Sequence, residues 1–398
     1  MAGIAGLVLS ALLVSVTAAG VFRYARPQIA LAVAPYDARA RAGLAQQLLS
    51  SSQAPSAETI RLASEYARDA YRSDPTAVAA LRVMGFVADL QGRRLEARRL
   101  LAYAETITKR DMLTELWLIE DRVAADDIAG ALRHYDTIMR TSEEVKPVLY
   151  PILTNATQTP EIARQVNRIL LARPNWWRNF LTYYLGAGND AAAFATVFQG
   201  MLDWSDEQDR ELATILLGRL SGAGRHDLAW AAYVDVRGLP ARQPGLLRDG
   251  NFRVERRLPP FDWSFAEDGE LIPDRRLRDG SDQDFVLYVP AGSSVAGDVA
   301  RQLLRLPPGR YRAEALVGSV AEDALRRPLV RIECAGQPAR RLAETDFPPA
   351  DAEARRLGME FSVPSGCANQ WFAIRVKGSL DRGVPEWPWI GSISLRRI

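Results

Sequence analysis

The stretch VAALRVMGFVADLQGRRLEARRLLAYAETITKRD, residues 78–111, decides the fold of this chain. Apolar residues recur at helical spacing on both sides of the turn at 91–93, which predicts two amphipathic helices packed as a pair. Three small residues, Gly85, Ala97 and Ala104, let the two helix backbones approach each other closely. A pair this small cannot bury its apolar faces alone, so we expect further pairs beside it.

The same pattern of small residues recurs on either side of this pair. Ala97 has counterparts at Ala63 and Ala131, one 34-residue period earlier and later. This pattern resembles the tetratricopeptide repeat, a two-helix unit of that length, and the resemblance covers residues 43–142. It implies an α-solenoid whose concave surface binds peptides or partner proteins.

We expect the all-α solenoid to occupy residues 35–237, although the period weakens after Pro147. Its concave surface would bind a protein partner, and aromatic residues between 176 and 184 are candidates for that contact. The alternative is that the same side chains fill the core between helices. They are Trp176, Trp177, Tyr183 and Tyr184.

A change of composition marks a linker at residues 238–248, where Pro and Gly are frequent and helical periodicity stops. Segments of alternating apolar and polar residues follow over 249–398 and predict an antiparallel β-sandwich. The sequence PPG at 307–309 predicts a tight turn between two of these strands. The fold class that we predict is therefore multidomain, α-helical first and β second.

Three segments of this second region carry another resemblance. NFRVERRLPPFDW (251–263), VARQLLRLPPGRYRAEALVG (299–318) and WIGSISLRRI (389–398) are similar to the jelly-roll sandwiches of carbohydrate-binding modules and galactose-binding-like domains. The resemblance implies a jelly roll that binds a polysaccharide. Those families often place an Asp linked to a structural Ca²⁺ near the final strand. This chain has Gly391 and Ser392 there, so we expect no metal.

A sugar-binding surface needs flat aromatic faces and a few polar groups in a concave site. The candidate ligand-binding residues are Trp387 and Trp389, with Trp371 and Glu386. The alternative for Trp389 and Trp371 is a place in the core. Trp387 is the residue that we expect to be exposed, because Glu386 and Pro388 flank it.

Cys334 and Cys367 are the two cysteines of the chain. We treat them as a candidate disulfide between neighbouring strands, and the alternative is a pair of free buried thiols. A bridge that closes about 33 residues would stabilise the domain by about 3 kcal/mol on the loop-entropy model.

Composition and motifs predict a protein that is not an enzyme. The formal net charge of +2 gives no basic field for nucleic acid. The sequence contains no phosphate-binding loop, dinucleotide fingerprint, nucleophile elbow or spaced His/Cys set, so we expect no cofactor. The two histidines, His134 and His226, are expected as surface or capping residues. A glycosidase with two carboxylates in a cleft is the remaining enzymatic alternative.

Residues 4–22 carry no charge and predict a transmembrane anchor within residues 1–23. The alternative is a cleaved signal peptide. Arg23 and Arg26 follow the apolar run and favour a cytoplasmic body, whereas the candidate disulfide favours the periplasm. We expect a single-pass inner-membrane protein with a periplasmic body, and a cytoplasmic body is the alternative.

These predictions together describe a bacterial, membrane-anchored adaptor without catalytic activity. Its solenoid would bind a protein partner, and its sandwich would bind a polysaccharide or another envelope component. Such a pair of domains suits exopolysaccharide or envelope assembly. The alternative is a pure protein–protein scaffold of a membrane complex that binds no glycan.

Overall fold

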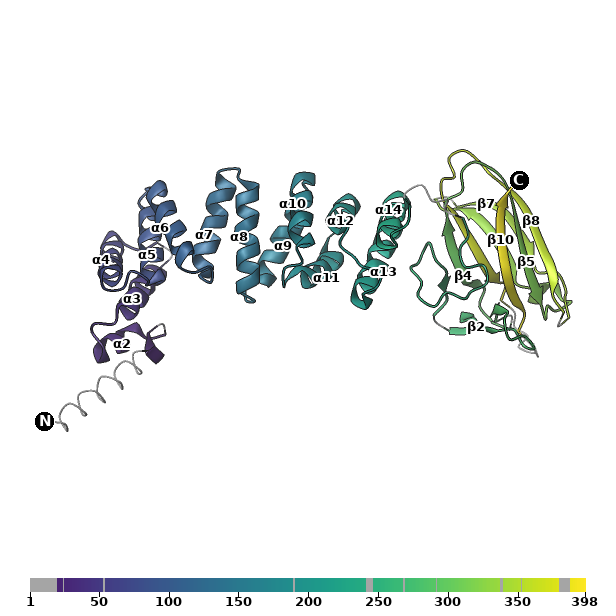
Figure 1. Cartoon of the computed structure of the whole chain (residues 1–398), viewed down its shortest axis with the longest axis horizontal. Helices are drawn as coiled ribbons and strands as arrows, with labels where there is room; N and C mark the ends of the chain where they lie inside the picture. The colour runs from purple at the N-terminus through teal and green to yellow at the C-terminus, as the bar shows by residue number, and fades with distance from the viewer. Residues whose placement is uncertain are drawn as a thin grey trace, which may run out of the picture. The chain divides into compact units, whose positions relative to one another are not determined.

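A computed structural model describes residues 20–23, 25–52, 54–188, 190–240, 246–267, 269–290, 292–336, 339–351, 353–378 and 387–398. The chain divides into two compact units. The first unit comprises Met1–Ala156 and Arg168–Phe180, and the second comprises Thr157–Asn167 and Leu181–Ile398. Along the chain, helices come first and strands second (Figure 1).

α-Helices follow one another from residue 27 to residue 236, coloured from purple to teal in Figure 1. They are α2 (Pro27–Val33), α3 (Ala38–Ser50), α4 (Ala57–Ser73), α5 (Val78–Leu90), α6 (Arg94–Ile107), α7 (Met112–Ala124), α8 (Ile128–Thr141), α9 (Lys146–Ala156), α10 (Pro160–Leu171), α11 (Trp177–Ala187), α12 (Ala191–Phe198), α13 (Glu207–Gly222) and α14 (His226–Val236).

Helices α5 and α6 are the pair that the sequence predicts. A Cβ atom added to Gly85 would lie 2.7 Å from Cγ of Leu101, so the glycine permits the close approach of the two helices. Ala97 and Ala104 are fully buried on the facing side of α6. Gly92 takes a φ of 76° in the turn between them, a conformation that glycine adopts without steric cost. The structure thus confirms this helix pair.

The counterparts of Ala97 are buried as well. Ala63 in α4 is 0% exposed, and Ala131 in α8 is 4% exposed. Polar side chains begin these helices by accepting a hydrogen bond from a free backbone N–H of the first turn. Ser56 caps α4 in this way, and Asp127 caps α8. Local sequence therefore determines where the helices begin, and small residues determine how they pack. The structure confirms a helical array.

The predicted transmembrane helix is wrong. A helix needs about 20 apolar residues in succession to cross a bilayer. Over the residues that the structure describes, no helix is both long and apolar enough for this. The longest of them, α4, has 17 residues and carries charged side chains such as Glu58 and Arg61. Residues 1–19, which hold most of the apolar run, lie outside the described part. The prediction of a single-pass inner-membrane protein is corrected for the same reason.

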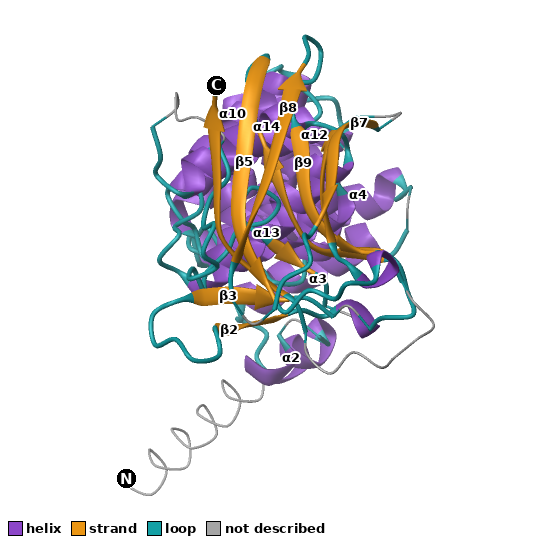
Figure 2. Cartoon of the chain, turned by 90° about the vertical axis from the view of Figure 1, so that its right-hand side faces the viewer, coloured by secondary structure: helices purple, strands orange, loops and turns teal. Residues whose placement is uncertain are grey.

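Two five-stranded antiparallel sheets form the β domain, in the orders β1-β4-β9-β6-β7 and β2-β3-β10-β5-β8. Figure 2 shows these strands in orange, with β5 beside β8 as their ladder requires. The strands are β1 (Ser264–Phe265), β2 (Asp274–Leu277), β3 (Phe285–Tyr288), β4 (Gly297–Leu304), β5 (Gly309–Gly318), β6 (Leu329–Cys334), β7 (Arg340–Asp346), β8 (Arg355–Val363), β9 (Gln370–Val376) and β10 (Trp389–Arg397).

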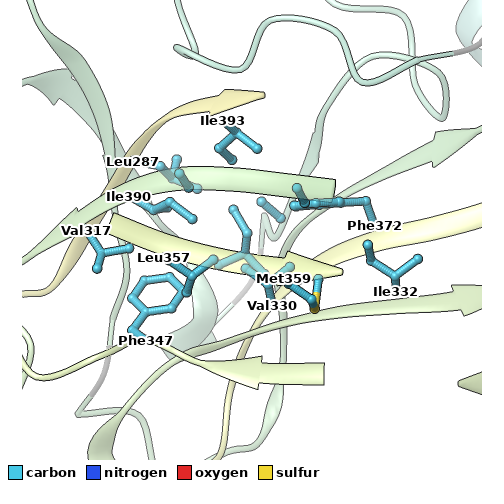
Figure 3. Packing of buried hydrophobic residues seen from close by; sticks show 14 of the residues in the cluster. Leu287, Val317, Val330, Ile332, Phe347, Leu357, Met359, Phe372, Ile390 and Ile393 are labelled. Carbon is cyan, nitrogen blue, oxygen red and sulfur yellow. The ribbon is translucent and has the colours of Figure 1, made fainter. Parts of the chain in front are cut away.

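The apolar core of this domain lies between the two sheets. From Leu357 on, every second residue of β8 is buried, because alternate side chains of a strand point to opposite faces of its sheet. Figure 3 shows Leu357 and Met359 of β8 among residues from both sheets, including Val330 of β6 and Ile390 of β10. The structure therefore confirms an antiparallel two-sheet sandwich in the C-terminal part of the chain.

Charged residues mark the edges of both sheets. The strands β2, β7 and β8 each lie at an edge, and each contains two adjacent arginines. These pairs are 275–276, 340–341 and 355–356, and all six side chains are exposed or half-buried. Free edges of this kind would otherwise present unpaired backbone groups to a neighbouring chain.

Helix α14 packs against the residues that lead into the sandwich, within the second unit. The ring of Trp230 meets the ring of Phe261 edge-on, with centroids 4.9 Å apart. The guanidinium of Arg248 lies over both Trp230 and Tyr233, at 5.6 and 5.2 Å from the ring centroids. Aromatic stacking and a cation–π pair therefore join the last helix to the β domain.

Candidate functional site

A groove of about 630 Å³ lies on the surface of the sandwich beside Trp387. Its walls come from the segment that leads into β2, the segment after β3 and Trp387, two residues ahead of β10. We call it the Trp387 groove. Its lining includes Glu270, Ile272, Asp274, Ser293 and Trp387.

Trp387 is 41% exposed, which is high for an indole side chain. Its position is determined by its neighbours, because the carbonyl of Pro388 accepts a hydrogen bond of 2.8 Å from the Val289 amide. The next residue, Trp389, begins β10 opposite Tyr288. The start of β10 thus holds one indole face at the groove.

Two carboxylates supply the polar side of the Trp387 groove. Glu270 accepts hydrogen bonds from the amide and hydroxyl of Ser294, at 2.6 and 2.8 Å, so its carboxylate is held in place. Asp274 is exposed and forms an ion pair of 2.9 Å with Arg276. The groove therefore combines one flat apolar face with acceptors for hydroxyl groups, the two features that a sugar site needs.

The other predicted ligand-binding residues lie elsewhere. Trp389 is 4% exposed, and a Cβ atom added to Gly318 would lie 2.5 Å from its ring, so it is a packing residue and the prediction of ligand contact is wrong for it. Trp371 lies on β9 in the opposite sheet, half-buried, with the Arg301 guanidinium 4.6 Å from its ring centroid. Glu386 lies outside the described residues.

The aromatic residues predicted to bind a partner are mostly buried. Trp176, Trp177 and Tyr184 are 1%, 9% and 2% exposed, and Tyr183 is half-buried. Trp176 donates a hydrogen bond of 2.9 Å to Asp136. Burial raises the pKa of Tyr184 to about 12, so its phenol stays protonated. The three buried rings fill the core between helices and offer no surface to a partner, which corrects the prediction for them.

A second groove, of about 400 Å³, lies in the first unit and is lined by residues of α3, α5 and the segment that joins α6 to α7. Arginines dominate its charge, and we call it the arginine groove. Arg39 and Arg110 are exposed, whereas Arg82 is buried and pairs with Asp111. Arginines thus outnumber acidic side chains among the residues that line this groove.

The two cysteines are joined in the structure by a disulfide between Cys334 and Cys367, with Cα atoms 5.5 Å apart. Cys334 ends β6 and lies opposite Gln370, the first residue of β9. The side-chain oxygen Oε1 of Gln370 accepts a hydrogen bond of 2.9 Å from the backbone N–H of Leu306. The bridge thus lies beside a buried polar contact at one end of the sheet.

Sequence reasoning missed a buried polar cluster in the first unit. His134, expected at the surface, is 6% exposed, and its Nδ1 lies 2.9 Å from Oε2 of Glu115. Glu105 completes the group, with Oε1 3.7 Å from the same nitrogen. A clue was present, since Glu115 lies at helical spacing from the apolar Leu118 and Ile119. We call these three residues the Glu115 cluster.

The other histidine, His226, is half-buried as the first residue of α14. Burial lowers the pKa of His226, although Asp227 opposes the shift. It is therefore a helix-end residue, and it lies far along the chain from the Glu115 cluster.

No family model matches the sequence, and no curated protein matches it. Among solved structures, the enzymatically active domain of bacteriophage CBA120 tailspike protein 4 is 14% identical, over 37% of this chain and 20% of that chain, with a TM-score of 0.26. The CBM22-1 xylan-binding domain of Paenibacillus barcinonensis Xyn10C is 12% identical, over 34% of this chain and 85% of that chain, with a TM-score of 0.25.

An arabinose-bound MgGH51 α-L-arabinofuranosidase is 15% identical, over 38% of this chain and 26% of that chain, with a TM-score of 0.27. This chain thus spans about a fifth of the tailspike domain and about a quarter of the arabinofuranosidase. Similarities this low show neither a shared family nor a shared activity.

Proposed function

We propose that this protein is a non-catalytic adaptor whose sandwich binds a polysaccharide or another envelope component and whose helical array binds a protein partner. The observation that carries the proposal is the exposed indole of Trp387 in a groove that also holds Glu270 and Asp274. The apolar face of a sugar ring stacks on an indole, while carboxylates accept hydrogen bonds from its hydroxyl groups.

The charge of the Trp387 groove narrows the class of glycan. Glu270 and Asp274 both contribute acidic groups, and Asp274 forms an ion pair with Arg276. A polyanionic polysaccharide would meet like charge there, which disfavours binding. We therefore propose a neutral polysaccharide as the ligand.

The finer assignments of the two regions are part of the same proposal. We take the helical array to be tetratricopeptide-like, which the burial of Ala63, Ala97 and Ala131 at 34-residue spacing supports. We take the sandwich to be a jelly roll of the carbohydrate-binding type, which agrees with its two five-stranded sheets. Exopolysaccharide or envelope assembly is the role that suits this pair of activities.

The glycan proposal is tested by calorimetry of the full chain against a panel of neutral and acidic soluble polysaccharides. We expect binding to at least one neutral member. Trp387→Ala should weaken it at least tenfold, and Trp387→Phe should weaken it less. The control is Tyr103→Ala, which removes an aromatic ring that is 47% exposed on α6, and should leave the affinity unchanged.

Three results would contradict the glycan proposal: no member of the panel binds, Trp387→Ala binds as tightly as the parent, or the acidic polysaccharides bind best. The same samples are assayed for release of reducing ends. We expect none, and steady hydrolysis that Glu270→Gln abolishes would instead show a glycosidase.

The partner proposal rests on the arginine groove, which suits an acidic segment of another protein. The charge-reversed double variant Arg39→Glu and Arg110→Glu changes two exposed side chains and leaves the buried Arg82 pair intact. A partner that co-purifies with the parent chain and is lost with this variant supports the proposal. Equal recovery with both chains argues against it. Partner binding without any glycan binding would identify a pure scaffold.

A further inference from the structure

Three consecutive helices bring Glu105, Glu115 and His134 to one point in the first unit. Glu105 lies on α6, Glu115 on α7 and His134 on α8. Their potential ligand atoms all lie within 4.8 Å of one another. His134 Nδ1 is 2.9 Å from Glu115 Oε2 and 3.7 Å from Glu105 Oε1. Neighbouring ligands of a tetrahedral zinc ion lie about 3.4 Å apart, so this spacing is that of a metal site with little rearrangement.

The Glu115 carboxylate lacks a partner for one of its oxygens. Its side chain is 1% exposed, and Oε1 is buried without a hydrogen-bond donor among the described residues. The other oxygen of the same carboxylate faces His134. An unsatisfied carboxylate oxygen in the interior is costly, and a bound cation is one way to remove that cost.

The negative charges of the Glu115 cluster exceed the positive charge that its histidine can supply. Two carboxylates face one imidazole, so even a protonated His134 compensates only one of them. Two arginines of α6, Arg94 and Arg98, both pair with Asp121 instead. A divalent cation would neutralise both carboxylates at once.

We propose that the Glu115 cluster is a binding site for a divalent transition-metal ion, held by one imidazole nitrogen and two carboxylates. Imidazole and carboxylate ligands together suit Zn²⁺ and its neighbours rather than Ca²⁺ or Mg²⁺, which take oxygen ligands alone. The ion would displace any proton from Nδ1 of His134 to solvent. The side chain of Glu105 is 27% exposed, so a metal ion would reach the cluster from solvent past this residue.

A metal at this point would cross-link α6, α7 and α8, and so would stabilise the array without taking part in the glycan or partner binding proposed above. Because the ligands lie on separate helices, the ion is bound only when the helices are packed. Binding free energy would therefore add to the stability of the folded array.

The test uses the full chain, purified without a histidine tag and freed of metal with a chelator. Zinc is titrated by calorimetry and by native mass spectrometry, and thermal unfolding is followed with and without zinc. We expect one ion per chain and a rise of about 5 °C in the midpoint at a zinc concentration 100 times Kd. Glu115→Gln and Glu105→Gln should each weaken zinc binding at least tenfold and abolish the rise.

Two control variants separate this site from adventitious binding. Glu120→Gln changes an exposed carboxylate on the same helix as Glu115, and His226→Gln changes the other histidine. Both should keep the zinc affinity of the parent chain. The metal-free Glu115→Gln variant should unfold no lower than the metal-free parent, because it removes an uncompensated charge and keeps the side-chain volume.

Other outcomes would overturn the proposal. The proposal is wrong if zinc binds with equal affinity to the parent and to both glutamine variants, or if zinc does not shift the unfolding midpoint of the parent. A metal-free Glu115→Gln variant that unfolds well below the parent, with no zinc effect in either, would identify a plain His134–Glu115 ion pair. Glu105→Gln, at the rim of the cluster, keeps the test decisive if Glu115→Gln does not fold.

Discussion

Tyr233 donates a hydrogen bond of 2.7 Å to the carboxylate of Asp262, and this bond joins α14 to the residues that enter the sandwich. Both side chains are buried, and the second carboxylate oxygen accepts from the amide of Leu258 at 2.9 Å. Burial raises the pKa of Tyr233, and the negative charge of Asp262 raises it further. The phenol therefore remains a donor throughout the physiological pH range, and the junction keeps its bond.

Replacing Tyr233 by Phe should lower the free energy of unfolding of the second unit by about 1.5–3 kcal/mol, because a buried carboxylate loses a donor. Urea unfolding followed by tryptophan fluorescence measures the change. Tyr103→Phe, at an exposed site, serves as the control and should stay within about 0.5 kcal/mol of the parent. A Tyr233→Phe variant as stable as the parent would show that the bond contributes nothing.

Gly85→Ala should destabilise the helical array, whereas Gly218→Ala should stabilise its own helix. A Cβ atom at Gly85 would lie 2.7 Å from the buried Leu101, and relieving that overlap costs about 1–3 kcal/mol. Gly218 on α13 has no atom within 4 Å of an added Cβ, so alanine gains about 1 kcal/mol from helix propensity. Denaturation midpoints of the two variants should move in opposite directions, and a shared direction would refute the packing argument.

The Asp121 ion pairs should make the stability of the array depend on pH. Burial opposes ionisation of Asp121, but hydrogen bonds from Arg98 and Arg94 outweigh it and lower its pKa below the ordinary 3.8. Its stabilisation is therefore fully present above that value and is lost as pH falls through the lower pKa of the folded state.

Asp121→Asn should lower the free energy of unfolding by about 1–2 kcal/mol at pH 7. The expected loss is this small because Arg94 and Arg98 are partly exposed, so solvent screens the two ion pairs. The difference between variant and parent should shrink between pH 4 and pH 3, as urea unfolding at pH 7, 4 and 3 would show. A difference that stays constant across this range would mean that Asp121 does not titrate as described.

Reduction of the Cys334–Cys367 bridge should lower the stability of the sandwich by about 3 kcal/mol, because the bridge closes a loop of 33 residues. The double variant Cys334→Ser and Cys367→Ser should show the same loss without reductant. Thermal unfolding with and without dithiothreitol measures both effects on the parent. If reductant also shifts the double variant, the change arises somewhere other than the bridge.

Local pattern was enough to predict the helix pair and the strands. Gly85 and Ala97 mark a close helix contact because their spacing is set by the helix itself, and PPG at 307–309 precedes β5 as a turn signal should. The transmembrane helix was predicted from the hydropathy of residues 4–22, and over the residues that the structure describes no helix is long and apolar enough to cross a bilayer.

The candidate sites were less predictable, because they depend on contacts between distant segments. Trp387 was expected to be exposed, but Glu270 and Asp274 come from another part of the chain and join it only in the folded sandwich. His134 was expected at the surface, and its burial follows from Glu105 and Glu115 on two other helices. The residue pattern of a single helix cannot show that side chains from three helices come together.

The paired arginines on β2, β7 and β8 also govern how the sandwich meets its surroundings. An outermost strand can recruit an incoming chain in extended form, and two like copies can fuse into one continuous ladder. Like charges on these strands repel a second copy of the same edge, which disfavours this route to fibres. At these three edges, we therefore expect a ligand to be held by side-chain contacts rather than by an added strand.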